Sequence, residues 1–159
     1  TRSIGNLSCD LLTITDWDGP ETIPSLTPGV NTVQLKPAIV VTARVHPAEG
    51  VASYMCAGII NFITGPSPEA QVLRERFVWY IVPMINPDGV VQGNTRVSLA
   101  GVDLNRQFRS PSRFLQPTVW HLRNLLEQIL DEGREIMFYF DLHGHCKKRG
   151  IFFYGNSVD

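Results

Sequence analysis

Cysteine is scarce in this sequence, and its spacing suits neither a disulfide framework nor a cysteine-rich metal site. The three cysteines, Cys9, Cys56 and Cys146, are odd in number and far apart, and no CxxC pair occurs. This usage is typical of free thiols in a reducing compartment, so we expect a cytoplasmic protein.

The sequence also lacks an excess of one charge and any long apolar segment. Its formal net charge is −1 at pH 7, which gives no long-range attraction to nucleic acid or to an anionic membrane. No stretch approaches the roughly 20 consecutive apolar residues of a membrane-spanning helix. The first residues, TRSIGNLSCD, lack the basic and apolar regions of a signal peptide. We therefore expect neither nucleic acid nor a membrane as a partner.

What is present is a series of short apolar segments separated by stretches rich in proline and glycine. The 159 residues, 43% of them apolar and 18% charged, suit one globular domain. We expect strands at residues 10–15, 37–45, 77–85, 135–141 and 151–154, and helices at 48–64, 68–76 and from Pro117 onward. The helix at 48–64 is apolar nearly all round and should be buried, whereas 16–36 and 90–116 should be irregular and 86–89 a turn. The pattern predicts an α/β fold, with helices on both faces of a mostly parallel or mixed twisted sheet.

Polar side chains follow two of the expected strands. His46 and Glu49 stand three residues apart in the first turn after the strand at 37–45, so they point to the same side. If the strand at 135–141 runs parallel to that one, His143 lies at the same edge of the sheet, where open α/β sheets build their sites. A third ligand from residues 141–145 would complete a set of two histidines and a glutamate, which suits hydrolytic zinc. Taken alone, HxxE also fits hydrogen-bonded structural residues.

Several motifs, taken together and in order, resemble one enzyme family. The segments VTARVHPAEG, VPMINPDGVVQGNTRVSLAGVDLNRQF and DLHGHCKKRGIFFYG are similar to the zinc metallocarboxypeptidases of the carboxypeptidase A type. Within these, the match is to the cytosolic carboxypeptidase branch, whose members trim glutamates from protein C-termini and from polyglutamate side chains. The opening GNLSCDLLTITD also looks like that branch. The resemblance thus runs over nearly the whole chain and implies a carboxypeptidase-like α/β/α fold.

The resemblance implies a role for each residue that matches a family motif. The three that match the ligands of one Zn²⁺ ion per chain are His46, Glu49 and His143. Arg96 matches the arginine that polarises the scissile carbonyl, and Asp103 matches the acid that orients the first ligand. The pair that binds the terminal carboxylate is matched by Asn105 and Arg106. The implied partners are peptide or protein C-terminal tails, acidic ones first, with tubulin-like tails as the family's candidate.

Other polar residues near these motifs have two readings each. His145 either supports the site, for example by pairing with Asp141, or is purely structural, and Asp141 is at least a hydrogen-bonding residue at the end of a strand. The basic residues Arg109, Arg113 and 147–149 either attract an acidic substrate or decorate loops. His121 fits an exposed helix residue. Cys146 lacks a recognisable residue to orient a base, so a thiol nucleophile is not expected.

The glutamate that serves this family as general acid and base, the tyrosine that closes over the substrate and the side-chain pocket all have no match here. We therefore expect residues 1–159 to be the N-terminal part of a catalytic domain, which should bind zinc and hydrolyse peptides poorly alone. Loss of the proton-transferring carboxylate typically costs about 10²–10⁴-fold in rate. In such a fragment the segment 151–154 would be an exposed edge strand.

Two other function classes share part of the pattern. Aspartoacylase-like zinc amidohydrolases also combine HxxE with a distant histidine, although the NPDG, NxRxS and DLHGH segments favour the peptidase. A fragment that binds metal and acidic tails without cleaving them is the third possibility.

Overall fold

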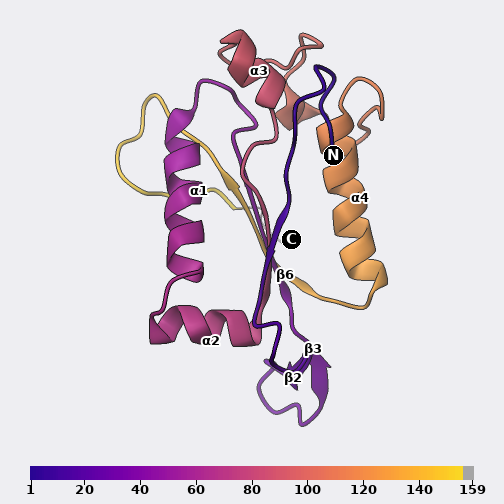
Figure 1. Ribbon diagram of the computed structural model, residues 1–159, viewed down its shortest axis with the longest axis vertical. Helices are drawn as coiled ribbons and strands as arrows, with labels where there is room; N and C mark the ends of the chain where they lie inside the picture. Colours follow the sequence, from indigo (N-terminus) through magenta and orange to yellow (C-terminus); the bar gives the residue numbers. More distant parts are fainter. Residues whose placement is uncertain (156–159) are drawn as a thin grey trace.

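The computed structural model describes residues 1–155, in which a four-stranded sheet is covered by helices on both faces (Figure 1). The expected domain boundary at Asp159 lies outside the described residues. In chain order the elements are β1 (Leu12–Ile14), β2 (Thr22–Pro24), β3 (Val33–Leu35), β4 (Ala38–Ala43), α1 (Gly50–Ile63), α2 (Pro68–Arg76), β5 (Val78–Val82), α3 (Pro87–Gln92), the 3₁₀ turn η1 (Leu104–Arg106), α4 (Pro117–Asp131) and β6 (Ile136–Leu142).

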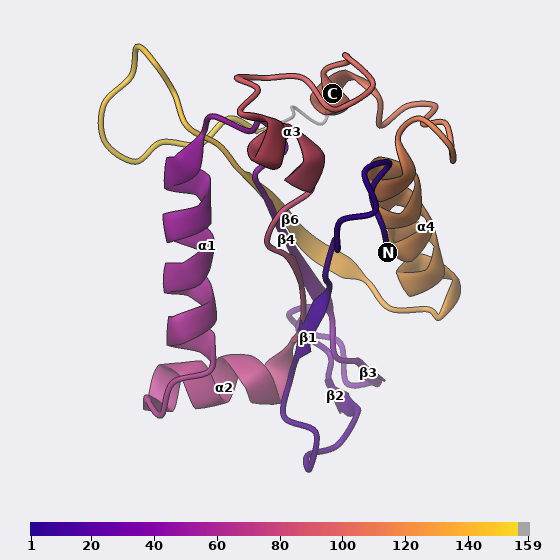
Figure 2. The ribbon, with the colours of Figure 1, turned by 45° about the horizontal axis from the view of Figure 1, so that its top comes forward.

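The sheet is mixed, and its strand order brings the two predicted site strands together. The order is β1-β5-β4-β6, in which β4 pairs in parallel with both β5 and β6, and β1 runs antiparallel to β5. The register places Thr42 of β4 opposite Asp141 of β6. The predicted parallel arrangement of the two site strands is therefore confirmed, and the segments that follow β4 and β6 emerge at one edge of the sheet (Figure 2).

The core follows from a central strand that is apolar on both sides. Every residue of β4, AIVVTA, is buried, as expected for a strand with helices on both faces. Alternate residues serve the two layers: Ile39 and Val41 pack in the cluster beneath α1, whereas Val40 packs with Ile129 of α4. Figure 1 shows α1 and α2 on one face and α4 on the other. The predicted α/β class is confirmed.

One predicted strand and one burial prediction are wrong. Residues 151–154 form no strand, and Ile151 is 91% exposed. Phe153 instead approaches Phe140 of β6 through its ring, so this apolar segment makes side-chain contact without backbone pairing. Helix α1 buries only the face that meets the sheet, and Tyr54 on its other side is 82% exposed. Because apolar residues are spread around the whole helix, the sequence did not indicate which face packs against the sheet.

Two segments expected to be irregular contain regular structure. The loop predicted at 16–36 holds a small antiparallel hairpin of β2 and β3, whose short strands are hard to recognise among prolines. The predicted turn Asn86–Gly89 is the start of α3, where the Asn86 side chain accepts a hydrogen bond from the Gly89 N–H at 3.0 Å. Asparagine is a preferred helix N-cap, and proline suits the first helical position.

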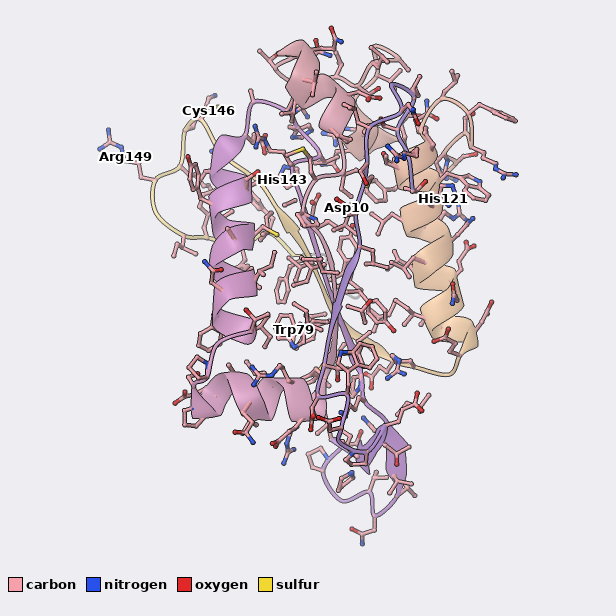
Figure 3. All side chains as sticks on the ribbon, in the orientation of Figure 1. Asp10, Trp79, His121, His143, Cys146 and Arg149 are labelled. Carbon is pink, nitrogen blue, oxygen red and sulfur yellow. The ribbon has the colours of Figure 1, made fainter. Side chains whose placement is uncertain are left out.

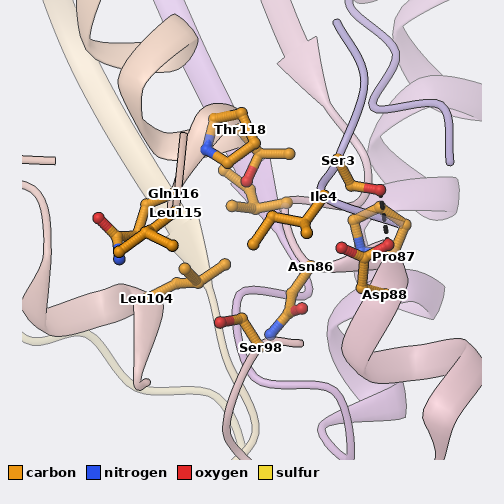
Figure 4. Close-up of a pocket in the computed structure, with 12 residues that line it drawn as sticks. Ser3, Ile4, Asn86, Pro87, Asp88, Ser98, Leu104, Leu115, Gln116 and Thr118 are labelled. Atoms are coloured by element: carbon orange, nitrogen blue, oxygen red, sulfur yellow. Dashed lines mark hydrogen bonds between the residues drawn. The ribbon is translucent and has the colours of Figure 1, made fainter. Parts of the chain in front are cut away.

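Asp88, in the same motif, ties the N-terminal segment to α3. Its buried carboxylate accepts hydrogen bonds from the Ser3 hydroxyl at 2.5 Å and from the Gly5 N–H at 3.1 Å, beside a small cavity (Figure 4). These contacts hold residues 3–5 against α3.

None of the helices in residues 1–155 combines the length and the apolarity that crossing a bilayer requires.

Candidate metal centre

Three side chains from distant parts of the chain meet at the carboxyl edge of the sheet. His46 and Glu49 lie between β4 and α1. His143, which is labelled in Figure 3, directly follows β6. The Nδ1 atoms of His46 and His143 lie 2.9 Å from Oε1 and 2.9 Å from Oε2 of Glu49, respectively. One ligand atom from each residue lies within 4.8 Å of the others. The structure thus brings together the three residues predicted to bind zinc.

The glycine that follows His143 lets the side chains of this group approach closely. The Gly144 N–H donates a hydrogen bond to Oε2 of Glu49 at 2.8 Å. A Cβ atom at Gly144 would lie only 3.4 Å from the Glu49 side chain and 3.1 Å from Val51. Glycine after His143 therefore allows β6 to end directly against the turn that carries Glu49.

Asp103 lies behind His46 and also contacts Arg96. One carboxylate oxygen of Asp103 lies 3.1 Å from Nε2 of His46, and the other accepts a hydrogen bond from Nε of Arg96 at 2.8 Å. Burial alone would raise the pKa of Asp103, but hydrogen bonds from the Asn105 N–H, His46 and Arg96 outweigh it and lower that pKa. The structure thus joins Asp103 to both His46 and Arg96, and its role in orienting the first ligand stays a prediction.

Asp141 holds His143 in the corresponding way, a role that the sequence analysis did not assign. Its Oδ2 atom lies 2.7 Å from Nε2 of His143, and its Oδ1 atom accepts a hydrogen bond from the Thr42 hydroxyl at 2.8 Å. The hydrogen bond with Asp141 raises the pKa of His143, against the opposing effect of burial. A signal was available, because residues two apart at a strand end share one side. The surroundings of His143 thus favour positive charge there.

The donor set has the chemistry of a zinc site. Three carboxylates, those of Glu49, Asp103 and Asp141, surround two imidazole rings. Both Nδ1 atoms face one carboxylate, while each Nε2 atom is held by another. Zinc takes nitrogen and oxygen ligands of this kind, and histidine ligands usually donate their other ring N–H to a carboxylate or a carbonyl. The residues therefore fit a divalent cation bound by the two Nδ1 atoms and Glu49.

Arg44 fixes the turn that carries His46 and Glu49. It adopts a left-handed backbone conformation with φ of 59°. Its Nε–H group donates to the Pro47 carbonyl at 2.8 Å, and its Nη1 group donates to the Ser53 hydroxyl of α1 at 2.7 Å. A non-glycine residue in this conformation is uncommon and is kept by its surroundings. The two hydrogen bonds are the compensating contacts here.

Substitution at Arg44 should separate these contacts from the backbone strain. We expect Arg44→Ala to lower the free energy of unfolding by about 2 kcal/mol, since it loses both hydrogen bonds and keeps the left-handed backbone. Arg44→Gly loses the same bonds but relaxes the strain, so it should be about 1 kcal/mol more stable than Arg44→Ala. Denaturant unfolding of the metal-free proteins measures both values. Unchanged stability of Arg44→Ala would show that the hydrogen bonds of Arg44 to Pro47 and Ser53 do not stabilise the turn.

Three further residues named in the sequence analysis, Asn105, Arg106 and His145, make hydrogen bonds within their own loops. Asn105 and Arg106 form η1 directly after Asp103, and the Arg106 guanidinium donates to the Asn105 carbonyl at 3.2 Å. Their role in binding a carboxylate stays a prediction. His145 does not pair with Asp141, because its Nδ1 atom accepts hydrogen bonds from the Lys147 and Lys148 N–H groups.

The additional basic residues make local contacts. Arg113 stacks over the Trp120 ring at 5.2 Å, and Lys148 lies over the Tyr154 ring at 4.5 Å. Figure 3 shows Arg149 projecting outward from the 144–150 loop. Cys146, in the same loop, is a free, exposed thiol, and His121 is an exposed residue of α4. The basic side chains thus stack on neighbouring rings or point outward, and their attraction of an acidic substrate stays a prediction.

Comparison with known proteins assigns the family. The three converging side chains have the arrangement of a site for a divalent cation, and a family model described as zinc carboxypeptidase matches residues 1–158. The chain therefore belongs to the zinc carboxypeptidase family. It is 47% identical over 154 residues to cytosolic carboxypeptidase 2 of Xenopus tropicalis, and the aligned region covers 97% of this chain and 15% of that protein. The chain thus spans about 15% of the length of this curated relative.

Solved structures agree with this assignment. The crystal structure of a metallo-carboxypeptidase from Burkholderia cenocepacia superposes with a TM-score of 0.74 at 31% identity, covering 91% of this chain and 35% of that one. An aspartoacylase family protein from Mesorhizobium loti superposes with a TM-score of 0.52 at 18% identity, covering 86% and 41%. The second likeness shows a shared fold alone, so the fold does not separate the two enzyme classes, whereas the family match favours the peptidase.

Proposed function

We propose that this chain forms part of a zinc-dependent metallocarboxypeptidase that removes C-terminal glutamate from acidic protein tails or from polyglutamate side chains. The observation that carries the proposal is the convergence of His46, Glu49 and His143, whose ligand atoms lie within 4.8 Å of one another. Membership of the zinc carboxypeptidase family supports zinc as the ion. The name of the Xenopus relative supports a cytosolic location and, through the family resemblance, glutamate as the residue removed.

The proposed chemistry divides among the residues of this chain. When bound, zinc supplies a Lewis acid for the peptide carbonyl and lowers the pKa of a water molecule to about 7. Asp103 and Asp141 hold the two histidine rings by their Nε2 atoms. The guanidinium of Arg96, fixed by Asp103, stabilises the negative charge that develops on the carbonyl oxygen.

Arg106 is proposed to bind the terminal carboxylate of the substrate, with Asn105 beside it. The Arg106 side chain is exposed and next to Asp103 in the chain, and arginine binds carboxylates through two parallel hydrogen bonds. An enzyme that binds the free C-terminal carboxylate of its substrate in this way acts as an exopeptidase.

Binding measurements test this recognition without requiring turnover. A peptide ending in four glutamates should bind the zinc-loaded protein, and the same peptide with an amidated C-terminus should bind at least tenfold more weakly, roughly the effect of one charge-assisted contact. Arg106→Lys should lose roughly tenfold toward the free acid and nothing toward the amide. Arg123→Lys on α4, whose guanidinium pairs with Glu127, is the matched control. Equal binding of acid and amide would contradict the proposed role.

Proton transfer is proposed to need a group outside residues 1–155. The three carboxylates at the site each contact a histidine, so none of them is left as a general base. A general acid or base contributes typically about 10²–10⁴-fold. The 159-residue chain alone should therefore cleave peptides far more slowly than the Burkholderia enzyme under the same conditions. Comparable rates would refute this part of the proposal.

The substrate class is tested by product analysis. The zinc-loaded protein is incubated with glutamate-ended peptides, alanine-ended peptides and small N-acyl amino acids, and released products are identified by mass spectrometry. Release of glutamate from the first substrate supports the proposal. Hydrolysis of the N-acyl amino acids alone would favour the amidohydrolase class. Tight binding of the glutamate-ended peptide without any released product would favour a role in binding acidic tails.

A further inference from the structure

We propose that Asp141, held in place by Thr42, is the positioning residue that presents His143 to the metal. The inference rests on the proposed zinc site and adds to it a hydrogen-bonded chain that starts in the middle of the sheet. That chain runs from the Thr42 hydroxyl to Asp141 at 2.8 Å and from Asp141 to Nε2 of His143 at 2.7 Å.

The geometry fits one tautomer of His143 when an ion is bound. A carboxylate accepts hydrogen bonds and does not donate them, so once an ion takes the place of a proton on Nδ1, the remaining ring proton lies on Nε2 and faces Asp141. The Nδ1 atom, which lies 2.9 Å from Glu49, is then the nitrogen whose lone pair is available for an ion. Asp141 therefore sets both the ring orientation and the nitrogen that binds metal.

Thr42 is suited to hold the carboxylate. It is completely buried in β4 and stands directly opposite Asp141 in the parallel register. A buried hydroxyl requires a hydrogen-bond partner, and its proton is directed to Oδ1 of Asp141. The Tyr139 hydroxyl, 3.2 Å away, can donate to the Thr42 oxygen in turn. Rotation of Asp141 away from His143 would therefore cost this hydrogen bond and leave the Thr42 hydroxyl with longer contacts, such as that to the Phe140 carbonyl at 3.5 Å.

The two ligand histidines are held by equivalent but separately built supports. His46 is held through Nε2 by Asp103, which comes from the segment before η1. His143 is held through Nε2 by Asp141, which stands two residues earlier in β6 and is fixed by Thr42 of the neighbouring strand β4. Because the supports do not share a residue, each can be removed without disturbing the other, and His46 provides an internal control.

Zinc affinity and stability measured side by side test the role. By competition with a chromophoric chelator, Asp141→Asn should bind zinc about 10- to 100-fold more weakly than wild type. Thr42→Val should show a smaller loss, and adding it to Asp141→Asn should cost no further affinity, because both act through one contact. Asp131→Asn, an exposed change at the end of α4, should match wild type. Denaturant unfolding of each metal-free protein shows whether the variant is folded.

A spectroscopic readout separates positioning from general destabilisation. In the zinc-loaded protein, the Nε2–H proton of His143, donated to a carboxylate, should give a downfield proton NMR signal, and Asp141→Asn should move it upfield. The corresponding His46 signal should stay in place. Wild-type zinc affinity in Asp141→Asn, or equal movement of both signals, would overturn the inference while leaving the zinc site intact. Failure of the wild-type protein to bind zinc would overturn the metal centre and this inference together.

Discussion

Replacing His143 with alanine should lower zinc affinity by at least about a thousandfold, so that the purified protein retains only a trace of the ion. Zinc bound by a full ligand set contributes on the order of 10–16 kcal/mol in small zinc domains. If the three residues of this site share a comparable total, one ligand carries about 4 kcal/mol, which corresponds to roughly a thousandfold in affinity. Elemental analysis after dialysis, and chelator competition, measure the loss.

The neighbouring histidine gives a matched control for this prediction. His145 stands two residues further along the same loop, is exposed, and accepts hydrogen bonds from backbone N–H groups of that loop. His145→Ala should therefore retain about one zinc ion per chain, the stoichiometry of a single ligand set. His46→Ala should behave like His143→Ala. Equal zinc content in all three variants would remove the metal centre on which the proposed function depends.

The convergence of His46, Glu49 and His143 could be predicted because their positions follow from backbone geometry. A histidine and a glutamate three residues apart after a buried strand point to one side, and parallel strands end at one edge. The sequence alone left the third ligand open between 141 and 145, and the family motif selected His143. In the structure His143 contacts Glu49, whereas His145 turns back onto its own loop, and the role of His143 as the third ligand stays a prediction.

The contact that holds Asp141 could not be predicted because it depends on register. Thr42 stands opposite Asp141, and a shift of one residue would have placed a different side chain there. The apolar segment 151–154 failed for a related reason. Its composition suits a strand, but a strand requires a pairing partner. Within the described residues this segment makes ring contacts with β6 and with the preceding loop, but no backbone pairing.

Loss of the Arg96 guanidinium should weaken transition-state binding far more than substrate binding. Its Nε–H group is fixed by Asp103, so the guanidinium is held beside the metal ligands before any charge develops. One such donor is typically worth about 3 kcal/mol in the transition state, or about 10²–10³-fold. Arg96→Ala should therefore bind a phosphinic peptide, which carries a tetrahedral oxyanion, about 10²–10³-fold more weakly. Calorimetry against the corresponding uncleaved peptide, whose affinity should change little, measures this difference.

Asp103 provides the test of whether Arg96 acts through its fixed position. Asp103→Asn keeps the shape of the side chain but removes the charge that holds both Arg96 and His46. This substitution should therefore reduce zinc affinity as well as phosphinic peptide binding, whereas Arg96→Ala should leave zinc affinity unchanged because Arg96 contacts neither ligand nitrogen. If both variants lost zinc equally, Arg96 would be part of the scaffold of the site. If Arg96→Ala weakened the phosphinic and uncleaved peptides equally, the arginine would contribute uniform binding, which raises no rate.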